Sequence, residues 1–402
     1  MNTPDLWTHI DIQPEIPSNI TELLFQLTKN LPITVHFCDG PGRKYVAGQA
    51  VGREQEFVTA MTPHIDRIDH LDLESYRYGE EGLVLTLLKL WFDRGSPSSA
   101  KSLMVYRHYR SQEGDEEYDT VMRHISENAE GMLRAVHILH LRAADIGWET
   151  GAFDGLTDFR FDASNHADLG TISTSEIFNV LLACPALAIL KLRSIEITRV
   201  HGWNPATPVK LGCLKILNLT GIFGIQYFLP IIDLPKDSPN LSVGLPTDSF
   251  LHDQVLSFVV PCQMEVLRLA YDDDYPASEK ASLFTSFPFL STLVLAPAGW
   301  LRSPLAVTDL TSCPQGQSTT LETVILVGEN VSLSYLEILV DKYQFKNIHL
   351  EGCYVSEDYP LCLEDTADSL VKRRPGVQCY VSSIDATKHL SEKVIFEHES
   401  YM

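Results

Sequence analysis

Residues 345–355 read FKNIHLEGCYV, and this stretch decides the fold. Its apolar residues at positions 345, 348 and 350 follow a simple spacing: apolar, two residues, apolar, one residue, apolar. Ile348 and Leu350 lie on one face of a short strand because strand side chains alternate between faces. Phe345, just before the strand, adds a third inward contact. One copy of this spacing predicts no more than one strand with one apolar face.

The same spacing recurs along most of the chain, at Ile68-Leu71-Leu73, Val136-Leu139-Leu141, Leu156-Phe159-Phe161, Leu187-Leu190-Leu192, Leu214-Leu217-Leu219, Met264-Leu267-Leu269, Leu290-Leu293-Leu295 and Leu321-Val324-Leu326. Weaker copies read PITVHF, KSLMVY, PNLSVGL and VQCYV. From residue 192 onward the last apolar positions are 24 to 31 residues apart, except for one interval of 50 that contains the weak copy NLSVGL. Such intervals are typical of stacked strand-and-helix repeats.

The segments between the expected strands read as amphipathic helices. Residues 173–184, STSEIFNVLLAC, open with Ser173 and carry Glu176 three residues later, which predicts a capping box. Residues 19–30 predict the same arrangement with Asn19 and Glu22. Two further helices are expected within 247–260 and 332–343. Strands alternating with helices indicate the α/β class.

This pattern resembles the leucine-rich repeat family of the long, irregular kind, over roughly residues 60–382. The family consensus L-x-x-L-x-L-x-x-N/C-x-L is met most fully at 345–355, where Cys353 holds the N/C position. The N/C position elsewhere holds Ala144, Ile195, Ile222, Asp272, Ala298 and Glu329. The resemblance implies an irregular solenoid of on the order of a dozen units, with a curved parallel sheet on the concave face and helices on the convex face.

The first residues carry a second resemblance. The stretch TPDLWTHIDI, residues 3–12, is similar to the closing segment of F-box-like domains in fungal proteins, with Pro4, Leu6 and Trp7 matching the P-x-LW turn. The resemblance implies a substrate receptor of a cullin-type ubiquitin ligase whose F-box binds the Skp1 adaptor. The helices that would hold Skp1 would lie before Met1. We therefore expect residues 1–14 to be the end of an F-box or an N-terminal cap, 15–382 the solenoid, and 383–402 a polar tail.

Composition limits the classes of function. Acidic residues outnumber basic ones and the net charge is −22, which argues against a nucleic-acid or anionic-membrane binder. The eight cysteines form no C-x-x-C pair, which favours buried thiols in a reducing cytoplasmic or nuclear compartment. We recognise no phosphate-binding loop, nucleophile elbow or zinc-protease motif. The sequence therefore predicts neither catalytic residues nor a metal site nor a cofactor.

In each strand, the residue between the two leucines and the residue just after the second leucine point away from the core. In a leucine-rich repeat this direction is the surface that faces a partner. In the middle of the solenoid these positions are basic, and an apolar group follows. The candidate partner-binding residues are Arg142, Arg160, Lys191, Arg193, Arg268, Val294, Ile325 and Val327. Because the guanidinium fork binds carboxylate or phosphate bidentately, we expect an acidic or phosphorylated protein segment as the partner.

The expected function is therefore that of a non-enzymatic protein-binding receptor, which recruits a substrate protein to a Skp1-cullin ligase if an F-box precedes it. One alternative is a free-standing interaction scaffold without a ligase link. Another, from a different class, is a cryptic hydrolase or transferase on an α/β fold.

Overall fold

Strands and helices alternate along the chain in the computed structural model. It describes residues 8–13, 17–38, 50–75, 83–107, 127–144, 148, 151–163, 170–203, 205–236, 241–247, 251–271, 289–297, 321–328, 330–355 and 362–382. The chain divides into two compact units. Unit 1 comprises residues 1–214 and 222–234, and unit 2 comprises residues 215–221 and 235–402.

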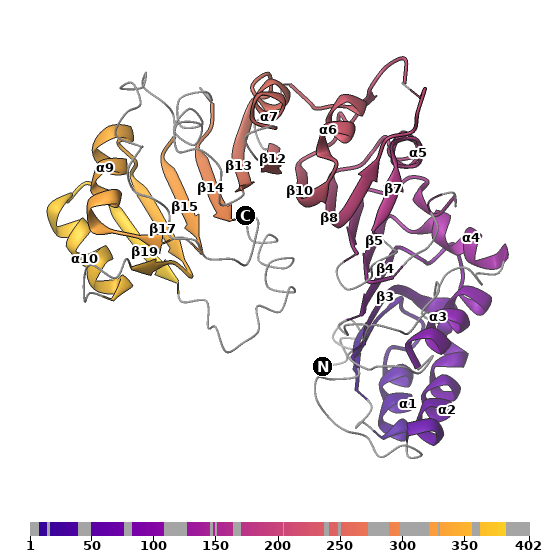
Figure 1. Cartoon of the computed structure of the whole chain (residues 1–402). Coiled ribbons are helices and arrows are strands. Elements are labelled where there is room, and N and C mark those ends of the chain that lie inside the picture. Colours follow the sequence, from indigo (N-terminus) through magenta and orange to yellow (C-terminus); the bar gives the residue numbers. More distant parts are fainter. Residues whose placement is uncertain are drawn as a thin grey trace, which may run out of the picture. The chain divides into compact units, whose positions relative to one another are not determined.

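Unit 1 is built on parallel strands in sequence order (Figure 1). They are β1 (His9–Ile12), β2 (Ile33–Cys38), β3 (Ile68–Ser75), β4 (Ser102–Arg107), β5 (Ile138–Arg142), β6 (Asp158–Asp162) and β8 (Ile189–Thr198). The short strand β7 (Thr171–Ser173) pairs with the end of β8. A parallel pair needs a crossover connection, and most crossovers here contain a helix: α1 (Ser18–Leu27), α2 (Ala50–Met61) with the 3-10 helix Thr62–Arg67, α3 (Leu83–Arg94), α4 (Glu127–Ala135) and α5 (Thr174–Ala183).

The register of unit 1 stacks the apolar positions into two continuous rows. One row runs Val35, Leu71, Leu103, Leu139, Phe159, Leu190, and the next runs Phe37, Leu73, Val105, Leu141, Phe161, Leu192. All of these side chains are buried. The helices cover this side of the sheet, and the buried Trp91 of α3 donates its indole N–H to the Ile68 carbonyl of β3 at 3.2 Å. The predicted leucine triplets therefore form one apolar spine within the unit.

Unit 2 repeats the plan. Its parallel strands run in the order β10 (Ile216–Phe223), β12 (Leu241–Thr247), β13 (Met264–Tyr271), β14 (Thr292–Pro297), β15 (Thr323–Val327), β17 (Asn347–Glu351) and β19 (Gln378–Ser382). Its helices are α7 (His252–Val259), α9 (Leu333–Tyr343) and α10 (Leu363–Arg373). Leu267, Leu293, Val324 and Ile348 are stacked in register and buried. The weak copies at 241–245 and 377–381 are thus genuine strands.

Short elements complete the two units. They are α6 (Ile225–Phe228), the 3-10 helices Gly151–Phe153 and Leu229–Ile231, and two small parallel pairs, β9 (Val209–Lys210) with β11 (Ile232–Asp233) and β16 (Asn330–Val331) with β18 (Tyr354–Val355).

The first turns of α5 and α1 test the two N-caps predicted from the sequence. The capping box of α5 is confirmed: Glu176 N–H donates to the Ser173 hydroxyl at 3.2 Å, and Ser173 N–H donates to the Glu176 carboxylate at 2.8 Å. The N-cap predicted at Asn19 is wrong. Pro17 precedes the first turn of α1, and its carbonyl accepts from Ile20 N–H and Thr21 N–H. Proline fits this position because the N-cap takes an extended backbone, here φ −58° and ψ 140°, which the fixed φ of proline allows.

The single consensus N/C residue behaves as the leucine-rich repeat pattern predicts. The buried Cys353 thiol donates to the Leu326 carbonyl of the preceding repeat at 3.1 Å. At the beginning of the chain, residues 9–12 form the expected strand β1, which pairs with β2. Pro4, Leu6 and Trp7 lie outside the described residues, as does the expected tail 383–402.

Candidate functional site

The face of unit 1 opposite the helices carries ionisable side chains on nearly every strand; we call it the polar face. Its main row follows the register Asp11, His36, Asp72, Met104, His140, Arg160, Lys191. The row beside it runs Cys38, Glu74, Tyr106, Arg142, Asp162, Arg193. Side chains of the main row occupy the strand position between two spine residues, and those of the second row follow the second spine residue. The sequence placed several of them correctly.

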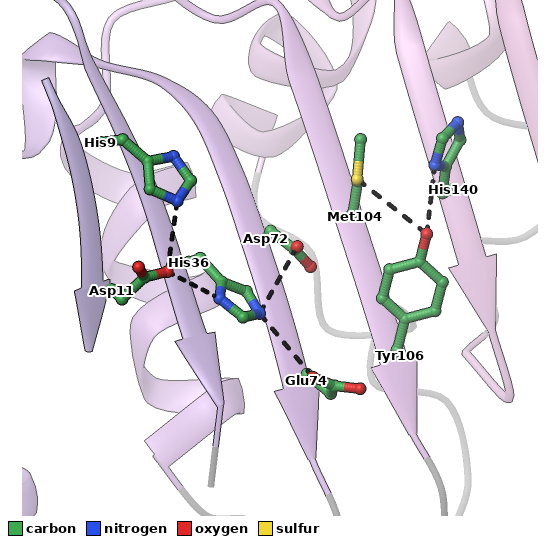
Figure 2. Close-up of polar contacts among 8 residues, drawn as sticks. All are labelled: His9, Asp11, His36, Asp72, Glu74, Met104, Tyr106 and His140. Carbon is green, nitrogen blue, oxygen red and sulfur yellow. Dashed lines mark hydrogen bonds and ion pairs between the residues drawn. The ribbon is translucent and has the colours of Figure 1, made fainter. Parts of the chain in front are cut away.

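Three carboxylates surround one imidazole on β1, β2 and β3 (Figure 2). His36 Nδ1 lies 3.0 Å from Asp11, while its Nε2 lies 3.7 Å from both Asp72 and Glu74. Hydrogen bonding to the buried Glu74 raises the pKa of His36 to about 9; burial opposes this shift, while the charge of Asp72 and a hydrogen bond to Asp11 add to it. His36 is therefore an imidazolium at neutral pH. His9 adds a contact to Asp11 at 3.2 Å.

This cluster makes stability depend on pH in a defined direction. Because the pKa of His36 is about 9 in the folded chain and 6.5 when unperturbed, its stabilisation is full below pH 6.5 and is lost as the pH rises through 9. Its side chain is 26% exposed, so solvent screens the effect. We expect the free energy of unfolding to fall by about 1 kcal/mol from pH 7 to pH 10. Urea unfolding across this range measures the fall, and His36→Gln should flatten it. An equal fall in His36→Gln would contradict this assignment.

A chain of polar contacts crosses β4, β5 and β6. The Tyr106 hydroxyl lies 3.2 Å from Nδ1 of His140 (Figure 2). His140 Nε2 lies 3.2 Å from Asp158. Arg160 donates to both oxygens of Asp158, at 2.9 and 3.0 Å. Burial, opposed by Asp158, lowers the pKa of His140. Burial acts to raise the pKa of Asp158, but bonds from His140 and Arg160 hold it below its usual range.

These two pKa shifts indicate the protonation states of His140 and Asp158 at neutral pH. The lowered pKa makes His140 a neutral imidazole at pH 7. Its Nδ1 is within hydrogen-bond distance of the Tyr106 hydroxyl, and its Nε2 faces the Asp158 carboxylate. The positive charge beside Asp158 is that of Arg160.

The predicted cations of unit 1 lie together, but they are far less accessible than strand alternation implies. Arg142 and Arg193 flank the buried Asp162, with Nε and Nη1 at 3.8 and 4.0 Å from its Oδ2. Lys191 is only 2% exposed. Arg160 and Arg193 keep a larger exposed surface than Arg142 and Lys191. The sequence therefore predicted the face of these residues, while it did not predict their burial or their carboxylate partners.

The remaining predicted residues belong to unit 2. Arg268, Val294 and Ile325 stand side by side on β13, β14 and β15, and Val327 lies two residues beyond Ile325. Val294 and Ile325 are buried although they face away from the leucine spine. His349 continues their row and stacks on Tyr380, with ring centroids 4.6 Å apart. Burial lowers the pKa of His349.

Sequence reasoning missed the cluster around His36. The signal was present, because PITVHF alternates and places His36 outward, but the copy was weak. Among the residues that the structure describes, no group of three or more histidine, cysteine, aspartate or glutamate side chains is arranged to hold a metal ion. None of the helices in that part of the chain is long and apolar enough to cross a membrane.

Together, the stacked parallel strands, crossover helices and continuous leucine rows define an α/β solenoid of leucine-rich-repeat type. Comparison with family models finds no match, and neither does a search of curated proteins. Among solved structures, the crystal structure of a TLR13–ssRNA13 complex is similar at 12% identity and a TM-score of 0.32. The match covers 80% of this chain, which spans 47% of the TLR13 chain.

Proposed function

We propose that the chain is a non-enzymatic protein-binding receptor that engages its partner with the polar face. One observation supports this most: ion pairs of buried or largely buried side chains line the polar face. Asp162 lies between Arg142 and Arg193, and Asp158 pairs with Arg160. Buried ion pairs often stabilise a fold no better than well-packed apolar residues. Their presence along one face is therefore better explained by recognition than by stability.

The favoured partner is an acidic or phosphorylated protein segment. Strands β5, β6 and β8 carry Arg142, Arg160, Lys191 and Arg193 on this face, against the carboxylates Asp158 and Asp162. Arg160 and Arg193 are the accessible members, and they are the residues that would contact the ligand. A guanidinium has five N–H groups, so its bonds to one aspartate leave donor capacity for an incoming carboxylate or phosphate.

A selection from a library of unmodified and phosphorylated peptides on the immobilised full chain tests this proposal. We expect acidic sequences to be enriched on the wild type. The double variant Arg160→Gln/Arg193→Gln should bind them at least about ten-fold more weakly, because lost charge-assisted hydrogen bonds cost about 1.5–3 kcal/mol. Fluorescence anisotropy with a selected peptide measures the dissociation constant, and circular dichroism checks that the variant is folded.

The matched control is Arg134→Gln on α4, on the helix side of the unit. Arg134 is exposed and donates to Glu130 at 2.6 Å, so the same chemical change is made away from the polar face. This variant should bind as the wild type does. Equal affinities of the double variant and the wild type, or a selection without acidic enrichment, would refute the proposed surface.

We propose further that the receptor acts in the cytoplasm or nucleus as the substrate-binding part of a Skp1-cullin ubiquitin ligase. The support is the resemblance of Pro4, Leu6 and Trp7 to the end of an F-box. Size-exclusion chromatography of the chain, extended by any upstream coding sequence, with purified Skp1 tests this link. A stable complex supports it, whereas separate elution favours the free-standing scaffold.

A further inference from the structure

Helix α1 carries an apolar stripe that the rest of unit 1 leaves exposed. Ile20, Leu23 and Leu27 are 45%, 51% and 38% exposed. Their spacing of three and four residues places them on one side of the helix. Phe25 and Thr21 of the same helix are buried. Helix α1 therefore has two apolar sides, and only one of them packs on its own sheet.

The exposed stripe faces away from the following repeats. Phe25 stacks on His64 of the 3-10 helix that precedes β3, with ring centroids 5.1 Å apart. Arg67 donates to the Thr28 hydroxyl and to the Leu31 carbonyl. Phe25 and Thr28 thus lie on the side of α1 that faces the 3-10 helix Thr62–Arg67. At 100° per residue the stripe lies on nearly the opposite side, at the N-terminal end of the unit.

Strand β1 ends the sheet at the same place. Within the described residues it pairs with β2 and with no other strand. Its polar-face residues, His9 and Asp11, flank the buried Ile10. An antiparallel copy of this strand centred on Ile10 would place each His9 opposite the Asp11 of the other copy. An imidazole can donate a hydrogen bond to a carboxylate in such a cross-strand pair, so the edge is complementary to itself.

We propose that this N-terminal end is an interface for a second copy of the chain, related by a two-fold axis perpendicular to the sheet. Such an axis keeps both sets of helices on the same side. Helix α1 connects β1 and β2, so it lies over them, and strands are about 4.8 Å apart. The two α1 helices would then be about 10 Å apart, which is the usual distance between packed helices.

The stripe is also complementary to itself. In an antiparallel pair of α1 helices centred on residues 23 and 24, Ile20 meets Leu27 and Leu23 meets the half-buried Leu24 of the other copy. The apolar side chains thus meet one another rather than the polar Glu22 and Gln26. Three apolar residues and a short strand form an interface at the small end of the usual range, so the expected dissociation constant is micromolar.

Sedimentation equilibrium of the full chain tests this proposal. We expect the wild type to dimerise at micromolar concentrations, and we expect Leu23→Glu and Leu23→Lys each to be monomeric. An equal mixture of these two variants should regain the dimer, because Glu and Lys would meet near the axis. This rescue separates loss of the interface from loss of folding. The control Leu182→Glu changes a leucine of α5 that is 60% exposed, and it should dimerise as the wild type does.

A wild type that stays monomeric throughout this range would overturn the proposal, as would a dimer that survives both Leu23 variants. Loss of the dimer in Leu182→Glu as well would also overturn it, because association would then depend on exposed leucines in general. The charged variants should remain folded, since exposed substitutions change stability by only about 0.5 kcal/mol.

Discussion

Replacing Asp162 by alanine is expected to lower the free energy of unfolding by about 3–5 kcal/mol. Asp162 is 1% exposed, and its Oδ2 lies 3.8 Å from Nε of the buried Arg142. Arg193 Nη1 lies 4.0 Å from the same oxygen. Removing the carboxylate leaves the Arg142 charge in the protein interior without its aspartate. Urea unfolding followed by circular dichroism measures the loss.

An exposed pair with the same separation serves as the control. Asp154 Oδ2 also lies 3.8 Å from an arginine Nε, that of Arg134, but both side chains are more than half exposed. Asp154→Ala should therefore cost at most about 1 kcal/mol. The double variant Asp162→Ala/Arg142→Met should regain part of the stability, because it removes the buried charge together with its partner. If Asp162→Ala cost no more than Asp154→Ala, burial would not control the energy of this pair.

Much of the fold is predictable because it depends on spacing along the chain. Leu190 and Leu192 lie two residues apart, so they share a face whatever surrounds them. Repeating that spacing in stacked units then gives a parallel sheet with one apolar side. The N-cap of α1 was predicted wrongly because two residues near the start of this helix, Pro17 and Asn19, can each occupy the N-cap position. Pro17 takes the N-cap position two residues before Asn19, so Asn19 lies inside the first turn of the helix and cannot cap it.

The polar face was predicted only in part, because its energetics depend on neighbours across strands. Strand alternation places Lys191 on this face, whereas its burial depends on packing that alternation does not describe. The pKa of His36 depends on Asp11, Asp72 and Glu74, which come from the strands on either side of β2. Their positions follow from register, which becomes known only when every strand, including a weak one, is correctly identified.

Replacing Phe159 by alanine tests the apolar spine itself, and we expect a loss of about 3–5 kcal/mol. Phe159 is fully buried between Leu139 and Leu190 in register. Its ring also meets Phe153 edge-on, with centroids 5.3 Å apart and an interplanar angle of 69°. Phe159→Leu should cost less, about 1.5 kcal/mol, because leucine refills most of the volume.

The loss should extend to neighbouring strands, since each repeat of a solenoid is stabilised by the repeats beside it. Native-state hydrogen exchange should therefore show weaker protection of the Leu139 and Leu190 amides in Phe159→Ala. The control Phe223→Ala, at a position 70% exposed, should change stability by no more than about 0.5 kcal/mol. If protection fell only within β6, the rows would be separate local clusters, and the continuous spine that positions the polar face would have to be abandoned.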